Sequence, residues 1–68
     1  GNLLLTASGQ SEIYVENYRS IIEYTSSLIK LQGKNCKVSI SGKALFIEYY
    51  TSDEMKIIGR IGEIKYYS

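Results

Sequence analysis

The sequence predicts a small all-β protein, an antiparallel meander of six to eight short strands packed as a β-sandwich or a partly open barrel. Short runs rich in isoleucine, leucine, valine and tyrosine alternate with polar residues at the period of two that strands require. Turn signals separate these runs about every eight to ten residues. Proline, which cannot donate a hydrogen bond to a strand ladder, is absent from the chain.

The central stretch is Cys36 to Tyr50, with the sequence CKVSISGKALFIEYY. It predicts a β-hairpin that turns at residues 41–43, where Gly42 can take the positive φ that a tight connection needs. Each arm has one apolar face, formed by Val38 and Ile40 in the first arm and by Leu45, Ile47 and Tyr49 in the second.

Four strands are expected before this hairpin, over residues 3–7, 12–16, 20–24 and 28–32. Asn17 follows the second of them and can take the left-handed conformation in the connection. In the third, Ile22 and Tyr24 are expected to point inward. A turn at residues 33–35 then leads into the hairpin.

The last run, Met55 to Tyr67, changes the parity of its apolar residues part-way along, which indicates a bend or bulge. Gly59 and Gly62 allow that bend, because glycine inside a strand commonly marks a bulge or a close backbone approach. The predicted core comprises Ile13, Val15, Val38, Ile40, Leu45, Ile47, Ile57 and Ile64.

A helix over Tyr18 to Leu31 is the alternative, because several apolar residues there fall near helical spacing. β-Branched and aromatic residues dominate this segment, and three hydroxyl residues interrupt it, which favours two strands and a turn.

With 68 residues the chain has room for one domain, residues 1–68, with a thin core. One cysteine and no histidine exclude an internal disulfide, the usual zinc sites and every histidine-based catalytic group. The sequence therefore predicts no enzyme, no metal and no cofactor. Unclosed sheet edges and a small core favour a homo-oligomer, formed by edge pairing or face packing.

The formal charge is +1, and no long run of like charge occurs. This balance argues against a nucleic-acid partner and against a membrane-surface helix. No apolar stretch approaches the roughly 20 residues of a membrane span, so direct membrane insertion is not expected. We expect a soluble, cytoplasmic protein.

Tyrosine is unusually abundant, with seven residues that include the pairs Tyr49-Tyr50 and Tyr66-Tyr67. Neighbours on a strand face opposite ways, so one tyrosine of each pair is expected in the core and the other outside. Exposed rings are good interface anchors. The predicted partner-binding residues are Tyr14, Tyr50 and Tyr67.

Four segments, taken in order, resemble the YabP/YqfC family of sporulation proteins: residues 12–17, 21–24, 38–47 and 54–66. The resemblance covers nearly the whole chain. It implies a β-sandwich-like protein of endospore-forming bacteria that acts in the mother cell during assembly of the outer spore layers. It also implies a sporulation membrane protein or coat-assembly protein as partner. The function that it implies is that of a non-enzymatic structural or adaptor protein, which acts through protein–protein contacts and also associates with itself.

The alternative function is a small β-barrel that binds single-stranded nucleic acid. Rings would stack on bases and lysines would follow the phosphates. The residues available for this role are Tyr14, Tyr18, Tyr50 and Tyr67, with Lys30, Lys43, Lys56 and Lys65.

Overall fold

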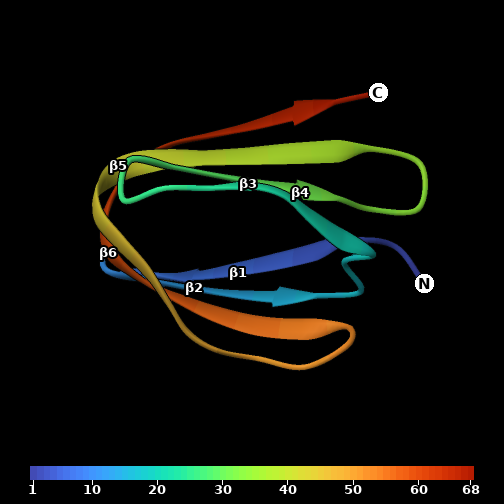
Figure 1. Ribbon diagram of the computed structural model, residues 1–68, viewed down its shortest axis with the longest axis horizontal. Helices are drawn as coiled ribbons and strands as arrows, with labels where there is room; N and C mark the ends of the chain where they lie inside the picture. Colours follow the sequence, from blue (N-terminus) through green and yellow to red (C-terminus); the bar gives the residue numbers. More distant parts are fainter.

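Six antiparallel strands form one sheet in the order β1-β2-β6-β5-β4-β3, as seen in a computed structural model that describes all residues from Gly1 to Ser68 (Figure 1). The strands are β1 (Leu4–Ser8), β2 (Glu12–Glu16), β3 (Ser20–Tyr24), β4 (Leu28–Gln32), β5 (Lys37–Tyr50) and β6 (Glu54–Tyr67). The all-β prediction is confirmed, and the structure excludes the helical alternative for residues 18–31. No helix in the structure is long and apolar enough to cross a membrane.

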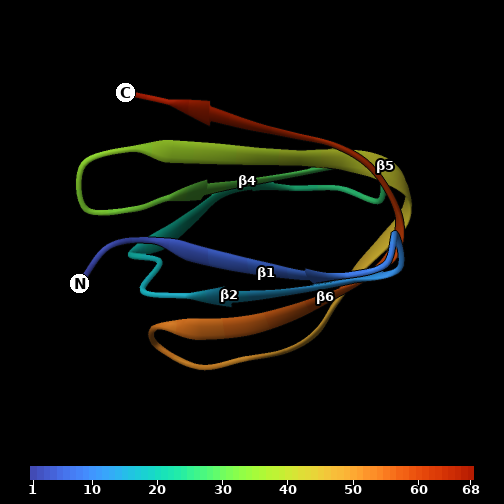
Figure 2. The same cartoon turned by 180° about the vertical axis from the view of Figure 1, so that it is seen from behind.

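The sheet folds over on itself because β5 and β6 bend at mid-length, so that two layers face each other (Figures 1 and 2). The β4 layer contains β3, β4, residues 37–41 of β5 and residues 63–67 of β6. The β2 layer contains β1, β2, residues 46–50 of β5 and residues 54–58 of β6. The sheet does not close, and β1 and β3 are its two edges.

The core lies between the two layers and consists of the inward residues of their strands. Seven of the eight predicted core residues are buried, and Ile64 is partly buried against them. The prediction is thus confirmed, and the structure adds Tyr18, Ile29, Leu31, Met55 and Ile61 to the core. Alternation at period two located this face because each strand buries one side only.

The predicted hairpin within residues 36–50 is wrong, because β5 runs without a turn from Lys37 to Tyr50. Gly42 does not have a positive φ, whereas Ala44 does, at 53°. Position 42 requires glycine because the backbones of β5 and β6 approach closely there. A Cβ at this position would lie 2.0 Å from the carbonyl oxygen of Arg60 on β6. Both predicted arms belong to β5, and the next turn of the chain lies between β5 and β6.

The bend predicted in the last run is confirmed. Gly59 has a φ of 140°, and a Cβ at this position would lie 2.6 Å from the carbonyl oxygen of Ala44. The two long strands therefore cross closely at their bends, and only glycine permits the approach.

The hairpin turns hold these bends in place. The β3–β4 turn accepts two bonds from β5, from Leu45 N to Ser26 O at 2.8 Å and from Gly42 N to Ser27 O. The β1–β2 turn accepts two from β6, from Ile61 N to Gln10 O at 2.7 Å and from Gly59 N to Ser11 O. At each bend, backbone N–H groups that have no partner in the neighbouring strand donate instead to carbonyl oxygens of a short hairpin turn.

The edge strand β3 differs from its prediction. All five of its residues are exposed at this edge, and Ile22, which has no partner in the register with β4, does not take its predicted inward place. A bulge between Ile21 and Glu23 shifts the register against β4. Tyr24 lies opposite the buried Ile29 and points inward as predicted, since its hydroxyl reaches the other layer and accepts a 2.9 Å bond from the Ile47 N–H.

The connection between β2 and β3 links the two layers. Asn17 has a φ of 67°, which confirms its predicted left-handed conformation. Tyr18 follows it and is only 6% exposed, and its hydroxyl donates a hydrogen bond to the Thr51 carbonyl. This ring therefore closes the end of the core opposite the bends.

Candidate functional site

The exposed tyrosines are spread over the molecule. Both members of each adjacent pair are exposed, from 41% for Tyr67 to 66% for Tyr50, so the expectation that one of each pair joins the core is wrong. The pairs lie at the ends of β5 and β6, beyond the tightly packed residues. A bulge in β5 also places Tyr49 opposite Lys56 and Tyr50 opposite Met55, which reverses the parity expected from sequence.

The three predicted partner-binding residues do not lie together. Tyr14 is on the outer face of the β2 layer, opposite Lys56 in the register. Tyr67 is on the outer face of the β4 layer, opposite Lys37. Tyr50 lies near the end of β5 beside the layer opening, close to Tyr18. Any partner that uses all three must therefore contact two different faces.

The outer face of the β2 layer is rich in carboxylates, and we call it the acidic face. Its members alternate along β2 and β6 with buried core residues, and Glu48 joins them from β5. The acidic face comprises Glu12, Glu16, Glu48 and Glu54, with Tyr14 and Lys56 among them.

Lys56 lies at the centre of this face, with its side chain 18% exposed. Its Nζ is 3.0 Å from Glu48 Oε1 and 3.4 Å from Glu12 Oε2, and it lies 5.4 Å from the centroid of the Tyr14 ring. The bond to Glu48 is the main cause that raises the pKa of Lys56 above its usual value, and the contacts with Glu12 and Tyr14 act in the same direction. One cation thus joins three strands.

We expect Lys56→Met to unfold at a lower urea concentration than the wild type. The change removes the only cation of the face and leaves Glu12 and Glu48 without a partner. Lys65→Met is the matched control, because Lys65 has no ion pair. Urea denaturation followed by circular dichroism measures both, and equal midpoints for the two variants would contradict a structural role for Lys56.

Glu16 and Glu54 form a second, different pair on the acidic face. They lie directly opposite each other on β2 and β6, and neither has a cation within 4 Å. Like charges in this position destabilise a sheet. The chain therefore keeps an electrostatic repulsion that its own residues do not relieve.

The outer face of the β4 layer carries lysines, and we call it the basic face. Lys30 and Lys65 lie on either side of Ser39, and Lys37 lies opposite Tyr67. Lys30 Nζ is 5.4 Å from the centroid of the Tyr67 ring, and the Tyr67 hydroxyl is 3.3 Å from Ser39 Oγ. Ser39 faces outward, but it is buried beside Lys30 and Tyr67. Lys34 adds a fourth cation in the adjoining turn.

Comparison with known proteins gives the same family as the sequence pattern. Residues 2–68 match the YabP family. The chain belongs to this family. It is also 29% identical over 62 residues to the uncharacterized protein YqfC of Bacillus subtilis (strain 168), an alignment that covers 91% of this chain and 67% of that protein. No solved structure matches.

The YabP-family chain does not assemble the residues named for nucleic-acid binding. Tyr18 is buried, and Lys56 is held by two carboxylates. Tyr14 lies on the acidic face, whereas Tyr67 lies with Lys30 and Lys65 on the basic face. Only part of the set therefore shares a surface.

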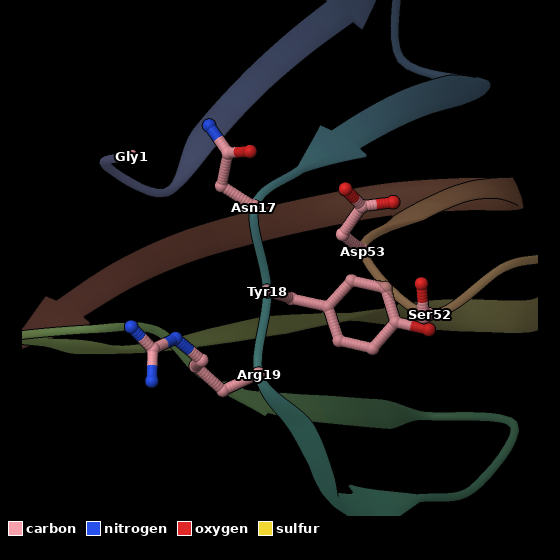
Figure 3. Close-up of a pocket in the computed structure, with 6 residues that line it drawn as sticks. All are labelled: Gly1, Asn17, Tyr18, Arg19, Ser52 and Asp53. Carbon is pink, nitrogen blue, oxygen red and sulfur yellow. The ribbon is translucent and has the colours of Figure 1, made fainter.

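A pocket of about 270 Å³ lies beside the β2–β3 connection of this YabP-family protein (Figure 3). Its lining residues are Gly1, Asn17, Tyr18, Arg19, Ser52 and Asp53. The Arg19 side chain points away from Asp53, and the Tyr18 ring lies toward Ser52. The charged groups do not converge, so the two outer faces are the stronger candidates for function.

Proposed function

We propose that this protein is a non-enzymatic structural or adaptor module of endospore formation that acts through protein–protein contacts. Membership of the YabP family supports the sporulation role. The observation that carries the contact role is the exposure of six of the seven tyrosines, because amphipathic rings outside a core are effective interface anchors.

The proposed setting is the cytoplasm of the mother cell in a sporulating bacterium. The proposed partner is a membrane protein or a coat-assembly protein of sporulation, in addition to further copies of this chain. Membership of the YabP family and the similarity to YqfC of Bacillus subtilis support this setting.

The experiment is a pull-down from sporulating cells of the parent organism with the wild type and a Tyr50→Ser, Tyr67→Ser variant. We expect the variant to fold and to lose its main partner, because loss of an aromatic anchor can reduce binding by about 2 kcal/mol or more. Circular dichroism verifies the fold, and mass spectrometry identifies the recovered proteins.

A Tyr49→Ser, Tyr66→Ser variant is the matched control, since it removes the adjacent exposed ring from each pair. We expect this control to keep the partner. Full recovery of the partner by the folded Tyr50→Ser, Tyr67→Ser variant would remove these tyrosines from the proposal and favour pairing at a sheet edge.

A further inference from the structure

The two layers differ in net charge, although charges of both signs are interspersed along the chain. Five of the seven acidic residues lie on the acidic face or in the turn beside it: Glu12, Glu16, Glu48, Asp53 and Glu54. Four of the eight cations lie on the basic face or in the turn beside it: Lys30, Lys34, Lys37 and Lys65. The other two acidic residues, Glu23 and Glu63, lie on the outer face of the β4 layer, where the four lysines outnumber them.

Most of these charges form no ion pair within 4 Å, although Glu23 lies opposite Lys30 in the register. Both ion pairs of the molecule belong to Lys56, so the four lysines of the basic face and its turn have none. Glu16 and Glu54 repel each other across β2 and β6. Contact with an oppositely charged surface would relieve the repulsion on each face.

We infer that the acidic face of one copy docks on the basic face of a second copy. The two faces are complementary in net charge, and this chain itself carries both of them. Such a contact joins two different patches, so each added copy leaves one free acidic face and one free basic face. Head-to-tail contacts of this kind form open stacks unless a rotation closes them into a ring.

The size of the faces sets the strength of the contact. Four strand segments about 4.8 Å apart, in a molecule 27 Å long, offer roughly 500 Å² on each layer. Two such faces bury about 1,000 Å² in total, near the lower limit for a specific interface. Tyr14 and Phe46 on the acidic face and Tyr67 on the basic face add apolar area. The association is therefore weak, concentration-dependent and weakened by salt.

This inference rests on the proposed function, because both assign protein–protein contacts to this chain. The inference adds the identity of one partner, a second copy of the chain. Two charge-reversed variants test it. Lys37→Glu, Lys65→Glu converts the basic face to an acidic one, and Glu16→Lys, Glu54→Lys does the converse. The second variant keeps a like-charge pair across β2 and β6, so its fold stability stays near that of the wild type.

Sedimentation velocity and light scattering at high micromolar concentration measure the assemblies. The wild type should exceed the mass of a monomer at low salt and return to it at high salt. Each variant alone should be a monomer, because both of its faces carry the same sign. An equimolar mixture should associate again, since the native acidic face of one variant meets the native basic face of the other.

A Lys43→Glu, Arg60→Glu variant is the control, because it makes the same change in net charge at the strand bends, away from both faces. It should associate as the wild type does. A monomeric wild type, a mixture that stays monomeric, or variants that still associate alone would each overturn the inference. The last result would favour edge pairing through β1 or β3.

Nucleic acid on the basic face is the competing occupant. Titration with an oligothymidylate tests it, and binding by the wild type that is lost in Lys37→Glu, Lys65→Glu would overturn self-association in favour of nucleic acid. A monomeric protein that still recovers a partner from sporulating cells would overturn the stacking inference alone and leave the proposed function standing.

Discussion

Replacement of Gly42 by alanine is expected to unfold the protein. The added Cβ would lie 2.0 Å from the Arg60 carbonyl oxygen and 3.1 Å from the Gly62 nitrogen, which are backbone atoms of the central neighbouring strand. Neither can move without separating β5 from β6 at their crossing. Overpacking of this kind costs about 3 kcal/mol or more, against a total stability of roughly 3 to 10 kcal/mol for a domain of this length. Circular dichroism and urea denaturation measure the outcome.

Gly9→Ala is the control, because Gly9 has a positive φ but no close neighbour that an added Cβ would meet. Its φ is +59°, and no heavy atom lies within 4 Å of an added Cβ. We expect a loss of about 1 kcal/mol from the left-handed backbone and a protein that stays folded. A Gly42→Ala variant as stable as Gly9→Ala would contradict the close crossing of the long strands.

Tyr18→Ala is expected to lower the free energy of unfolding by about 3 to 5 kcal/mol, because it empties a ring-sized volume at the end of the core. Tyr18→Phe separates the hydroxyl from the ring. It leaves the Thr51 carbonyl without its side-chain donor, which should cost about 1 to 2 kcal/mol. Urea denaturation of both variants measures the two contributions, and a Phe variant as damaging as Ala would assign the whole effect to the hydroxyl.

Tyr18 also makes stability depend on pH. Burial, and then the nearby Tyr50 and Asp53, raise the pKa of Tyr18 above its usual value of 10.0. The folded protein then keeps a proton that the unfolded chain has lost, so the free energy of unfolding falls as pH rises from 10.0 through the folded pKa. Below this range the contribution is complete. Tyr18→Phe should show a shallower alkaline fall, and an unchanged slope would exclude Tyr18 as its source.

The sequence was sufficient for the strands and the core because both depend on local alternation. The bounds predicted for β2, β3 and β4 match the structure, and the apolar parity of Ile13 and Val15 identified the inner face. The prediction of a hairpin within residues 36–50 is wrong because a tight turn and a bent strand have the same local pattern. In both, two runs of alternating apolar residues flank a glycine. The distinction depends on Arg60, which lies across from Gly42 and far along the chain.

The charged faces could not be predicted from chain order. Glu16 and Glu54 are neighbours only through the pairing of β2 with β6, which no local pattern specifies. The parity of Tyr49 and Tyr50 was misassigned for a related reason, since a bulge near Glu48 exchanges the positions of the two rings relative to β6. Residues whose role depends on register between distant strands therefore required the structure.

The central position of β6 determines when this protein can fold during its synthesis. β6 is the last of the six strands in chain order, yet it lies between β2 and β5 in the sheet. The β1–β2 hairpin is complete at residue 16, but its neighbour in the sheet begins at residue 54. The β2 edge of this hairpin therefore has no strand partner until β6 has been synthesised. Assembly of the β2 layer therefore waits for the synthesis of residues 54–58, and a ribosome that stalls within the β5–β6 turn holds a chain without the strand that joins β2 to β5.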